Sequence, residues 1–206
     1  MTKIHLHRFD LPDHIDLSDS LAVDCETMGL SLARDRLCLI QMSDGSGEVH
    51  IVQFGDDYDC PNIKALIADP KRQKMFHYAR FDVAMIRKHL GVTCANVWCT
   101  KIASKLARTY TDRHGLKDVV REMCDIDLSK AQQSSDWGQT DLSQAQLAYA
   151  ANDVLYLHRV KAGLEAMLVR LDRLHLAQSC FDFLATRVEL DLLDWENDDI
   201  FAHSWR

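Results

Sequence analysis

The first hundred residues alternate short apolar runs with turn residues, a pattern that predicts strands. Three runs come first, SLAVDCET, DRLCLIQMS and GEVHIVQF, and DGSG between the last two is a hairpin signal. They predict an antiparallel meander. A helix over NIKALIAD then stops before Pro70, KMFHYA predicts a strand, a helix from Phe81 to Leu90 ends at Gly91, and NVWCT predicts a short strand.

The second half has helical apolar spacing almost throughout. After KIASKLARTY, three further helices are predicted over GLKDVVREMC, SQAQLAYAANDVLYLHRVKAGLEAML and LHLAQSCFDFLATRVELDLL. Ser143 with Gln146 three residues on predicts a capping box at the start of the second. This order predicts an α/β fold with a mixed central sheet, three antiparallel strands first, flanking helices and a helical C-terminal part.

Two acidic residues lie at the end of the first predicted strand. Asp24 and Glu26 are two residues apart, so they project from the same face of the strand. Two adjacent anions repel each other, and a cation or a shared proton would relieve that repulsion.

Further acids occupy places that this fold order brings towards the same strand end. Asp82 lies in the first turn of its helix, and Tyr149 and Asp153 share one helix face by their spacing. Each has an ordinary alternative: a common strand-end pair, an acid that suits the helix dipole, or a solvated helical pair. Their joint appearance favours an oxygen-rich site for Mg²⁺ or Mn²⁺, where two ions would promote phosphodiester hydrolysis.

Composition narrows the class of protein. The 206 residues include 47% hydrophobic ones, enough for a core, and 3 Pro and 8 Gly without repeats or a linker indicate one domain. A net charge of −7 argues against a protein that binds long duplexes through phosphate contacts. Seven cysteines without a C-x-x-C pair predict reduced core residues. Neither a signal peptide nor a membrane span is evident, so a soluble cytoplasmic protein is expected.

Three segments resemble the motifs of a known enzyme family. VDCETMGL, HYARFDVAMI and YAANDVLYL are similar to the three motifs of the DEDDy branch of 3′-to-5′ exonucleases, the ribonuclease D group. RHGLKDVVRE and QSSDWGQTDLSQAQ also resemble that group, and over its length the chain is similar to its short stand-alone NanoRNase C members. The resemblance implies a ribonuclease H-like fold, two divalent ions, a preference for diribonucleotides and an octameric ring. It also implies one exonuclease domain over 1–206, with 174–206 as C-terminal helix and tail and no accessory helical nucleic-acid-binding domains.

The resemblance assigns roles to the motif residues. Asp24, Glu26, Asp82 and Asp153 are expected to be metal ligands, with Asp24 bridging the ions. Tyr149 is expected to orient the attacking water, because a phenol with a pKa near 10 is a poor base at neutral pH. Leu30 matches a leucine that inserts between two bases, and a core leucine is the alternative.

Candidate substrate contacts lie beside the motifs and in two polar stretches. His77, Arg80 and Phe81 flank the second motif, with a buried structural role as the alternative for both rings. Residues 100–121 hold six Lys or Arg: Lys101, Lys105 and Arg108 share a predicted helix face, and Arg113, His114 and Lys117 cluster at a turn. A solvated charged face is the alternative. The loop before the third motif adds Lys130, Gln133 and Ser134. Trp137 in this loop is expected to anchor it by packing, with a base-stacking platform as the alternative.

These residues favour a 3′-to-5′ exoribonuclease that acts on very short RNA, chiefly diribonucleotides such as pGpG. Trimming of longer or structured RNA 3′ ends is the alternative, and the intact motif residues argue against an inactive nucleic-acid-binding module. The tail carries Trp195, Phe201 and Trp205, which are expected to dock on a surface. That surface is either their own domain or the basic stretch of a neighbouring subunit in a homo-oligomer.

Overall fold

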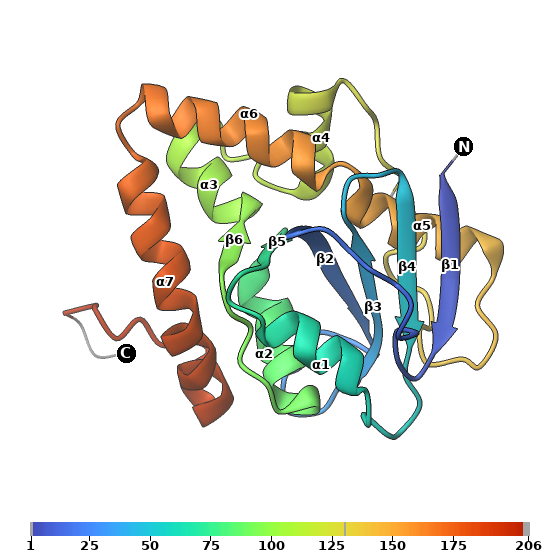
Figure 1. The fold of residues 1–206 in the computed structure, drawn as a ribbon. Coiled ribbons are helices and arrows are strands. Elements are labelled where there is room, and N and C mark those ends of the chain that lie inside the picture. The colour runs from blue at the N-terminus through green and yellow to red at the C-terminus, as the bar shows by residue number, and fades with distance from the viewer. Residues whose placement is uncertain (1, 130, 204–206) are drawn as a thin grey trace.

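A six-stranded mixed sheet forms the centre of the computed structural model, which describes residues 2–129 and 131–203 (Figure 1). The strands lie in the order β1-β4-β3-β2-β5-β6. β2 pairs antiparallel with β3, and β3 with β4, which confirms the predicted meander. The remaining pairs are parallel. The strand bounds are β1 Lys3–Arg8, β2 Ser20–Thr27, β3 Leu37–Ser43, β4 Glu48–Gln53, β5 Gln73–Phe76 and β6 Val97–Cys99.

The edge strand β1 was not predicted. Its sequence KIHLHR does alternate apolar and polar positions, but Ile4 is only half-buried and Leu6 is exposed. An edge strand pairs on one side alone, so it needs less apolar surface than the central β3, where all seven residues are buried. The hydrophobic signal of β1 is correspondingly weak.

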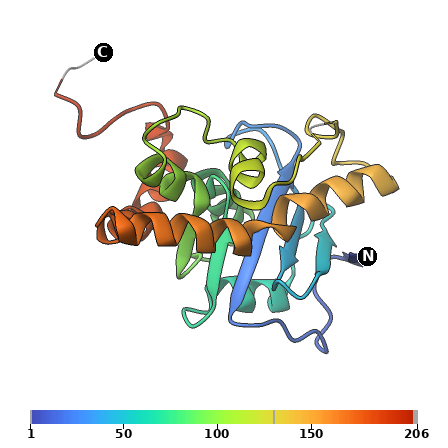
Figure 2. The ribbon, with the colours of Figure 1, turned by 90° about the horizontal axis from the view of Figure 1, so that it is seen from above.

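The helices follow the prediction closely, with one break. They are α1 Pro61–Ala68, α2 Ala79–Leu90, α3 Thr100–Ala107, α4 Leu116–Cys124, α5 Gln144–Leu155, α6 Leu157–Arg170 and α7 Leu174–Leu190, followed by a π-helical turn Asp191–Trp195. Gly91 ends α2 with a φ of 73°, and Ser143 and Gln146 form the predicted capping box. The single long helix expected after Ser143 is wrong, because the chain bends at Tyr156 between α5 and α6 (Figure 2). The bend lets α5 pack on the sheet while α6 packs on α3 and α4.

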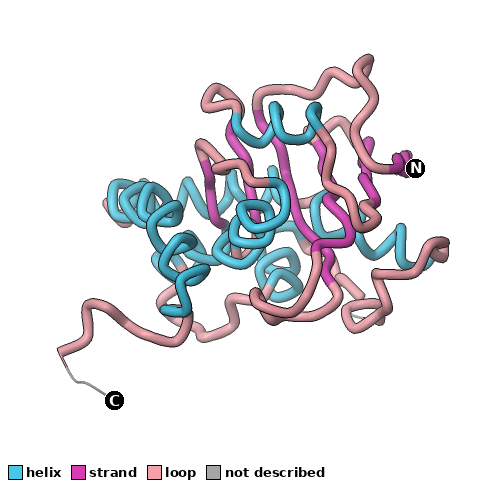
Figure 3. The backbone as a smooth tube through the Cα atoms, turned by 90° about the horizontal axis from the view of Figure 1, so that it is seen from below, coloured by secondary structure: helices cyan, strands magenta, loops and turns pink. Residues whose placement is uncertain are grey.

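Helices cover both faces of the sheet. α1 lies in front of the strands in Figure 1 and α5 behind them, while α7 packs against α2, α3 and β6. Figure 3 shows residues 196–203, which follow the π-helical turn, as a loop that leads away from the helices. Six of the seven cysteines are buried and unpaired, as expected, and Cys180 is exposed. Within the described residues, no helix combines the length and apolarity that a membrane crossing requires.

Candidate active site

Asp24 and Glu26 project from the end of β2, in the middle of the sheet. Asp24 lies opposite Gln41 of β3 in the strand register, and the Gln41 Nε2 donates a 2.7 Å hydrogen bond to the Asp24 Oδ2. This bond holds one carboxylate oxygen in place. The sequence analysis did not find Gln41, because its nearness to Asp24 depends on the pairing register of two strands.

The left-handed turn before α2 positions the third carboxylate. Tyr78 precedes the helix with a φ of 75°, and one turn later Asp82 is buried with 4% of its surface exposed. Its Oδ1 accepts a 3.1 Å hydrogen bond from the backbone N–H of Cys25, the residue between Asp24 and Glu26. Asp82 is therefore fixed to β2 by the main chain.

α5 brings the remaining two motif residues to the same place. Asp24, Glu26 and Asp153 each offer a carboxylate oxygen within 4.8 Å of the others. Asp82 and Tyr149 line the same cleft, whose volume is about 710 Å³. The Tyr149 ring packs against buried Trp137, with ring centroids 6.0 Å apart. The expected packing role of Trp137 is thus confirmed, since it supports the tyrosine.

The cleft brings four carboxyl groups close together. Burial raises the pKa of all four carboxyl groups, and repulsion from Asp82, Asp153 and Glu26 adds to the effect at Asp24. Burial and the carboxylate of Asp153 also raise the pKa of Tyr149, so its hydroxyl stays protonated at neutral pH. Half-buried and buried carboxylate oxygens that repel one another fit Mg²⁺ or Mn²⁺, whose binding would relieve the repulsion.

Several candidate substrate contacts line the cleft. Leu30 is 80% exposed at its edge, so the core-leucine alternative is wrong. Phe81, Gln133 and Ser134 line the wall, together with Lys101 and Lys117 from the basic stretch.

His77 also lines the cleft, in a defined protonation state. The Thr100 hydroxyl donates to the Phe76 carbonyl, so it accepts from His77 Nδ1 across 2.8 Å. Burial lowers the pKa of His77 to about 3, which keeps the ring neutral with Nε2 as an acceptor.

Two arginines that were predicted to contact substrate lie outside the cleft lining. Arg80, predicted to contact substrate, instead ion-pairs with buried Asp191, with N···O distances of 2.6 and 2.7 Å. It therefore ties α2 to the C-terminal segment and lies outside the cleft lining. Arg108 is buried and ion-pairs with Glu122. It follows the last residue of α3 with non-helical backbone angles, so it leaves the helix face that Lys101 and exposed Lys105 share.

Two further candidates are not found in the cleft wall, and a third falls outside the part of the chain that the structure describes. Arg113 is exposed and lies outside the cleft lining. The His114 Nδ1 is hydrogen-bonded to the Ser104 hydroxyl over 2.9 Å, also outside the lining. Lys130 lies outside the described residues.

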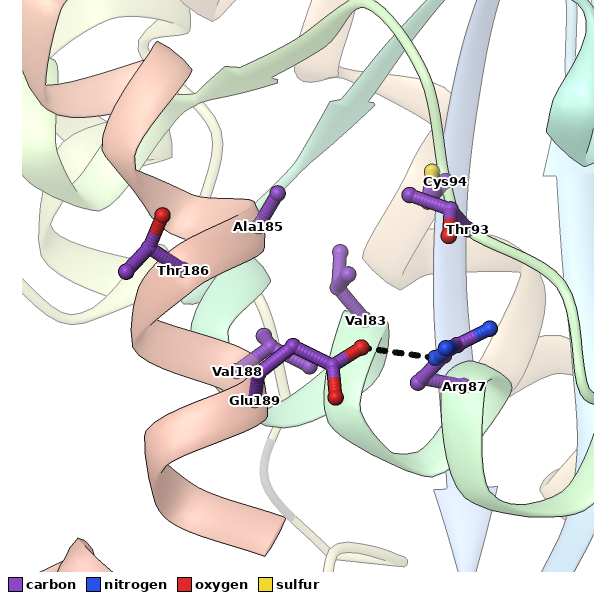
Figure 4. A pocket seen from close by; sticks show the side chains of 8 residues that line it. All are labelled: Val83, Arg87, Thr93, Cys94, Ala185, Thr186, Val188 and Glu189. Atoms are coloured by element: carbon purple, nitrogen blue, oxygen red, sulfur yellow. Dashed lines mark hydrogen bonds and ion pairs between the residues drawn. The ribbon is translucent and has the colours of Figure 1, made fainter.

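A second, smaller cavity of about 270 Å³ lies between α2 and α7 (Figure 4). Arg87 and Glu189 form a 2.8 Å ion pair across it, and its apolar lining includes Val83, Ala185 and Val188. Its one carboxylate is already paired. The larger cleft is therefore the candidate active site.

Comparison with known proteins agrees with this assignment. Residues 11–169 match the model of a family described as 3′-5′ exonuclease. A ribonuclease D from Acidiphilium cryptum is 32% identical over 165 residues, which are 80% of this chain and 42% of that protein. The chain thus spans about two-fifths of the length of that relative.

Two solved structures match the chain over nearly its whole length. Brucella melitensis NrnC bound to pGG is 51% identical, with a TM-score of 0.94 and coverage of 99% of this chain and 100% of that one. The same protein with bound Mg²⁺ is 50% identical, with a TM-score of 0.92 over 98% and 100% of the two chains. The fold, the cleft and these matches lead to one conclusion: this chain belongs to the 3′-5′ exonuclease family.

Proposed function

We propose that this chain is a metal-dependent 3′-to-5′ exoribonuclease that hydrolyses very short RNA, chiefly diribonucleotides, to 5′-nucleoside monophosphates. The observation that carries the proposal is the convergence of four carboxylates and Tyr149 on one cleft. The solved relative bound to pGG supports the substrate class. The cleft volume of about 710 Å³ suits a ligand with a volume of a few hundred Å³, and the volume of a dinucleotide is of that order.

Asp24, Glu26, Asp82 and Asp153 would hold the two ions, Mg²⁺ or Mn²⁺. When bound, the ions lower the pKa of water and stabilise the negative charge that develops during phosphodiester cleavage. The solved relative with bound Mg²⁺ supports this ligand class. The Gln41 amide and the Cys25 N–H orient Asp24 and Asp82 in advance, so little rearrangement is needed when a cation binds.

The other residues of the cleft would position the substrate. The protonated Tyr149 hydroxyl orients the attacking water by hydrogen bonding, while the side chain of Leu30 contacts the bases from the cleft edge. Phe81 and neutral His77 form the wall beneath the 3′ nucleoside. Lys101 and Lys117 bring positive charge to the phosphates, which the net charge of −7 otherwise repels.

We further propose a cytoplasmic homo-octamer in which 1–206 form a single exonuclease domain and 174–206 its C-terminal helix and tail. Exposed Trp195 and Phe201, 48% and 78% accessible, support contacts between subunits. A ring that encloses each cleft would exclude long RNA. The second candidate function, trimming of longer RNA 3′ ends, is favoured by the similarity to ribonuclease D.

Product analysis on radiolabelled RNAs of two to about twenty nucleotides tests the proposal. Diribonucleotides should be cleaved fastest with Mg²⁺, and EDTA should stop the reaction. Asp24→Asn should remove turnover while the protein still binds substrate, and Asp141→Asn, at an exposed loop aspartate, is the matched control. Faster cleavage of the longest RNAs would favour the trimming function, and undiminished hydrolysis in EDTA would exclude the metal mechanism.

A further inference from the structure

A second cluster of potential metal ligands lies on the edge strand, far from the carboxylate cleft in the sheet order. β1 carries His5 and His7, and β4 carries Glu48 and His50. The parallel register places His5 directly opposite His50. Because side chains two residues apart in a strand share a face, all four lie on one face of the sheet.

The side chains of this cluster are already close together. His5, Glu48 and His50 each offer one ligand atom, and these atoms lie within 4.8 Å of one another. The His5 Nε2 is 3.1 Å from the Glu48 Oε2, and the His5 and His50 ring centroids are 4.8 Å apart. A tetrahedral zinc ion with ligands at 2.0–2.2 Å needs ligand atoms about 3.4 Å apart. Half-exposed His5 can rotate to reach that geometry.

The strand register separates this cluster from the catalytic cleft. Asp24 pairs with Gln41, Gln41 with Ile51, and Ile51 with Leu6, so these four share the face that carries the carboxylates. His50 adjoins Ile51 in β4 and therefore projects from the opposite face. A ligand bound there cannot touch the cleft.

We propose that His5, Glu48 and His50 form a binding site for a transition-metal ion of the zinc class, which fastens the edge strand β1 to β4. Two imidazoles and one carboxylate are a ligand set that zinc uses in proteins, with water in the fourth position. This donor set differs from the all-oxygen set of the cleft, which suits Mg²⁺ or Mn²⁺ instead.

Neighbouring residues favour one ligand of the cluster, His50, and compete for another, Glu48. The His7 Nε2 lies 3.0 Å from the His50 Nδ1, a contact that fixes the His50 ring as outer partners do at metal sites. Burial and the adjacent histidines lower the pKa of His50, so its ring is neutral and able to ligate at pH 7. Lys3 opposes the site, because its Nζ holds the other Glu48 oxygen at 2.7 Å.

Zinc titration of the untagged full chain tests the proposal by calorimetry. His5→Gln and Glu48→Gln should each lose one equivalent of bound zinc or bind it at least about tenfold more weakly. Lys3→Gln should bind zinc more tightly, because it frees a Glu48 oxygen and removes a repelling charge. His175→Gln, at an exposed histidine on α7, is the matched control and should bind as the wild type does.

Two further measurements distinguish this site from zinc uptake by the carboxylates. Zinc should raise the unfolding temperature of the wild type more than that of His5→Gln. Anomalous scattering from zinc-soaked crystals should show a peak between His5 and His50. Unchanged zinc binding in both ligand variants, or a peak in the catalytic cleft alone, would overturn the proposal. Because both ligand variants change half-exposed side chains, they should fold, whereas buried His50 is left unchanged.

Discussion

Asp153 offers a carboxylate oxygen within 4.8 Å of those of Asp24 and Glu26. Asp153→Asn removes one of four mutually repelling charges and one ligand. We expect hydrolysis to fall by at least about a hundredfold. In EDTA the unfolding temperature should rise, because repulsion is relieved, by about 2–4 °C for each kcal/mol gained. Single-turnover assays and calorimetric melting check the two effects, and a wild-type rate would contradict the ligand role.

Burial and Asp153 raise the pKa of Tyr149. Its side chain therefore acts as a protonated hydroxyl that can form hydrogen bonds, and it does not act as a base. Tyr149→Phe keeps the ring that packs on Trp137. We expect kcat to fall about ten- to a hundredfold while KM changes little, because water is positioned only in the reacting complex. Steady-state kinetics on a diribonucleotide measure both. Tyr156→Phe, outside the cleft lining, is the control, and a parallel loss there would point to folding instead.

The raised carboxyl pKa values also predict how pH affects the metal-free protein. The folded carboxyls of Glu26, Asp82 and Asp153 bind protons that the unfolded chain has released above its ordinary pKa of about 4. Stability in EDTA should therefore fall as pH rises from about 5 to 8. Saturating Mg²⁺ should remove this slope. Urea unfolding at several pH values tests it, and a stability that rises with pH in EDTA would exclude these shifts.

At the scale of elements, the loop after β2 presents Leu30 to the cleft. The side chain of Asp35 holds this loop in shape by a hydrogen bond. The Asp35 Oδ2 accepts the Ser31 N–H at 2.9 Å. A Cβ at Gly29 would lie 2.4 Å from that oxygen. Gly29→Ala should therefore displace the carboxylate, cost about 1–3 kcal/mol of stability and raise KM by moving Leu30.

Urea unfolding and diribonucleotide kinetics check this effect. Gly55→Ala is the control, because its Cβ would meet only Phe9 at an ordinary 3.7 Å. Equal stability of the two variants would show that the loop has room to adjust.

At the scale of the whole molecule, two arginines hold the C-terminal segment. Arg80 and Arg187 both ion-pair with buried Asp191, and they bond backbone carbonyls from Trp195 to Asp198. Phe201 contacts Phe183, with ring centroids 5.8 Å apart, yet stays 78% exposed. The segment is thus anchored at its start and leaves aromatic surface available to a neighbouring subunit.

Deletion of residues 195–206 tests the assembly proposal. The truncated protein should fold, because Asp191 and α7 remain, but its mass by light scattering should fall. Its preference for diribonucleotides over longer RNA should weaken as the cleft opens. Circular dichroism provides the folding control. An unchanged mass together with an unchanged length preference would exclude a role of the tail in assembly.

Much of the fold and the chemistry was determined by local sequence patterns. Alternation places Asp24 and Glu26 on one face of a strand, and a four-residue spacing places Tyr149 and Asp153 on one face of a helix. The meander, the end of α2 at Gly91 and the capping box were predicted for the same reason. Each depends on residues close together in the chain.

The tertiary structure decided what depends on contacts between distant segments. The register of β2 and β3 gives Asp24 its Gln41 partner, and the ion pair with Asp191 after α7 holds Arg80 outside the cleft lining. The same holds for the His5–His50 pair, which exists only because an unpredicted edge strand pairs with β4. Periodicity shows which side chains share a face of one element, but pairing and packing between elements are set by the free energy of the whole fold.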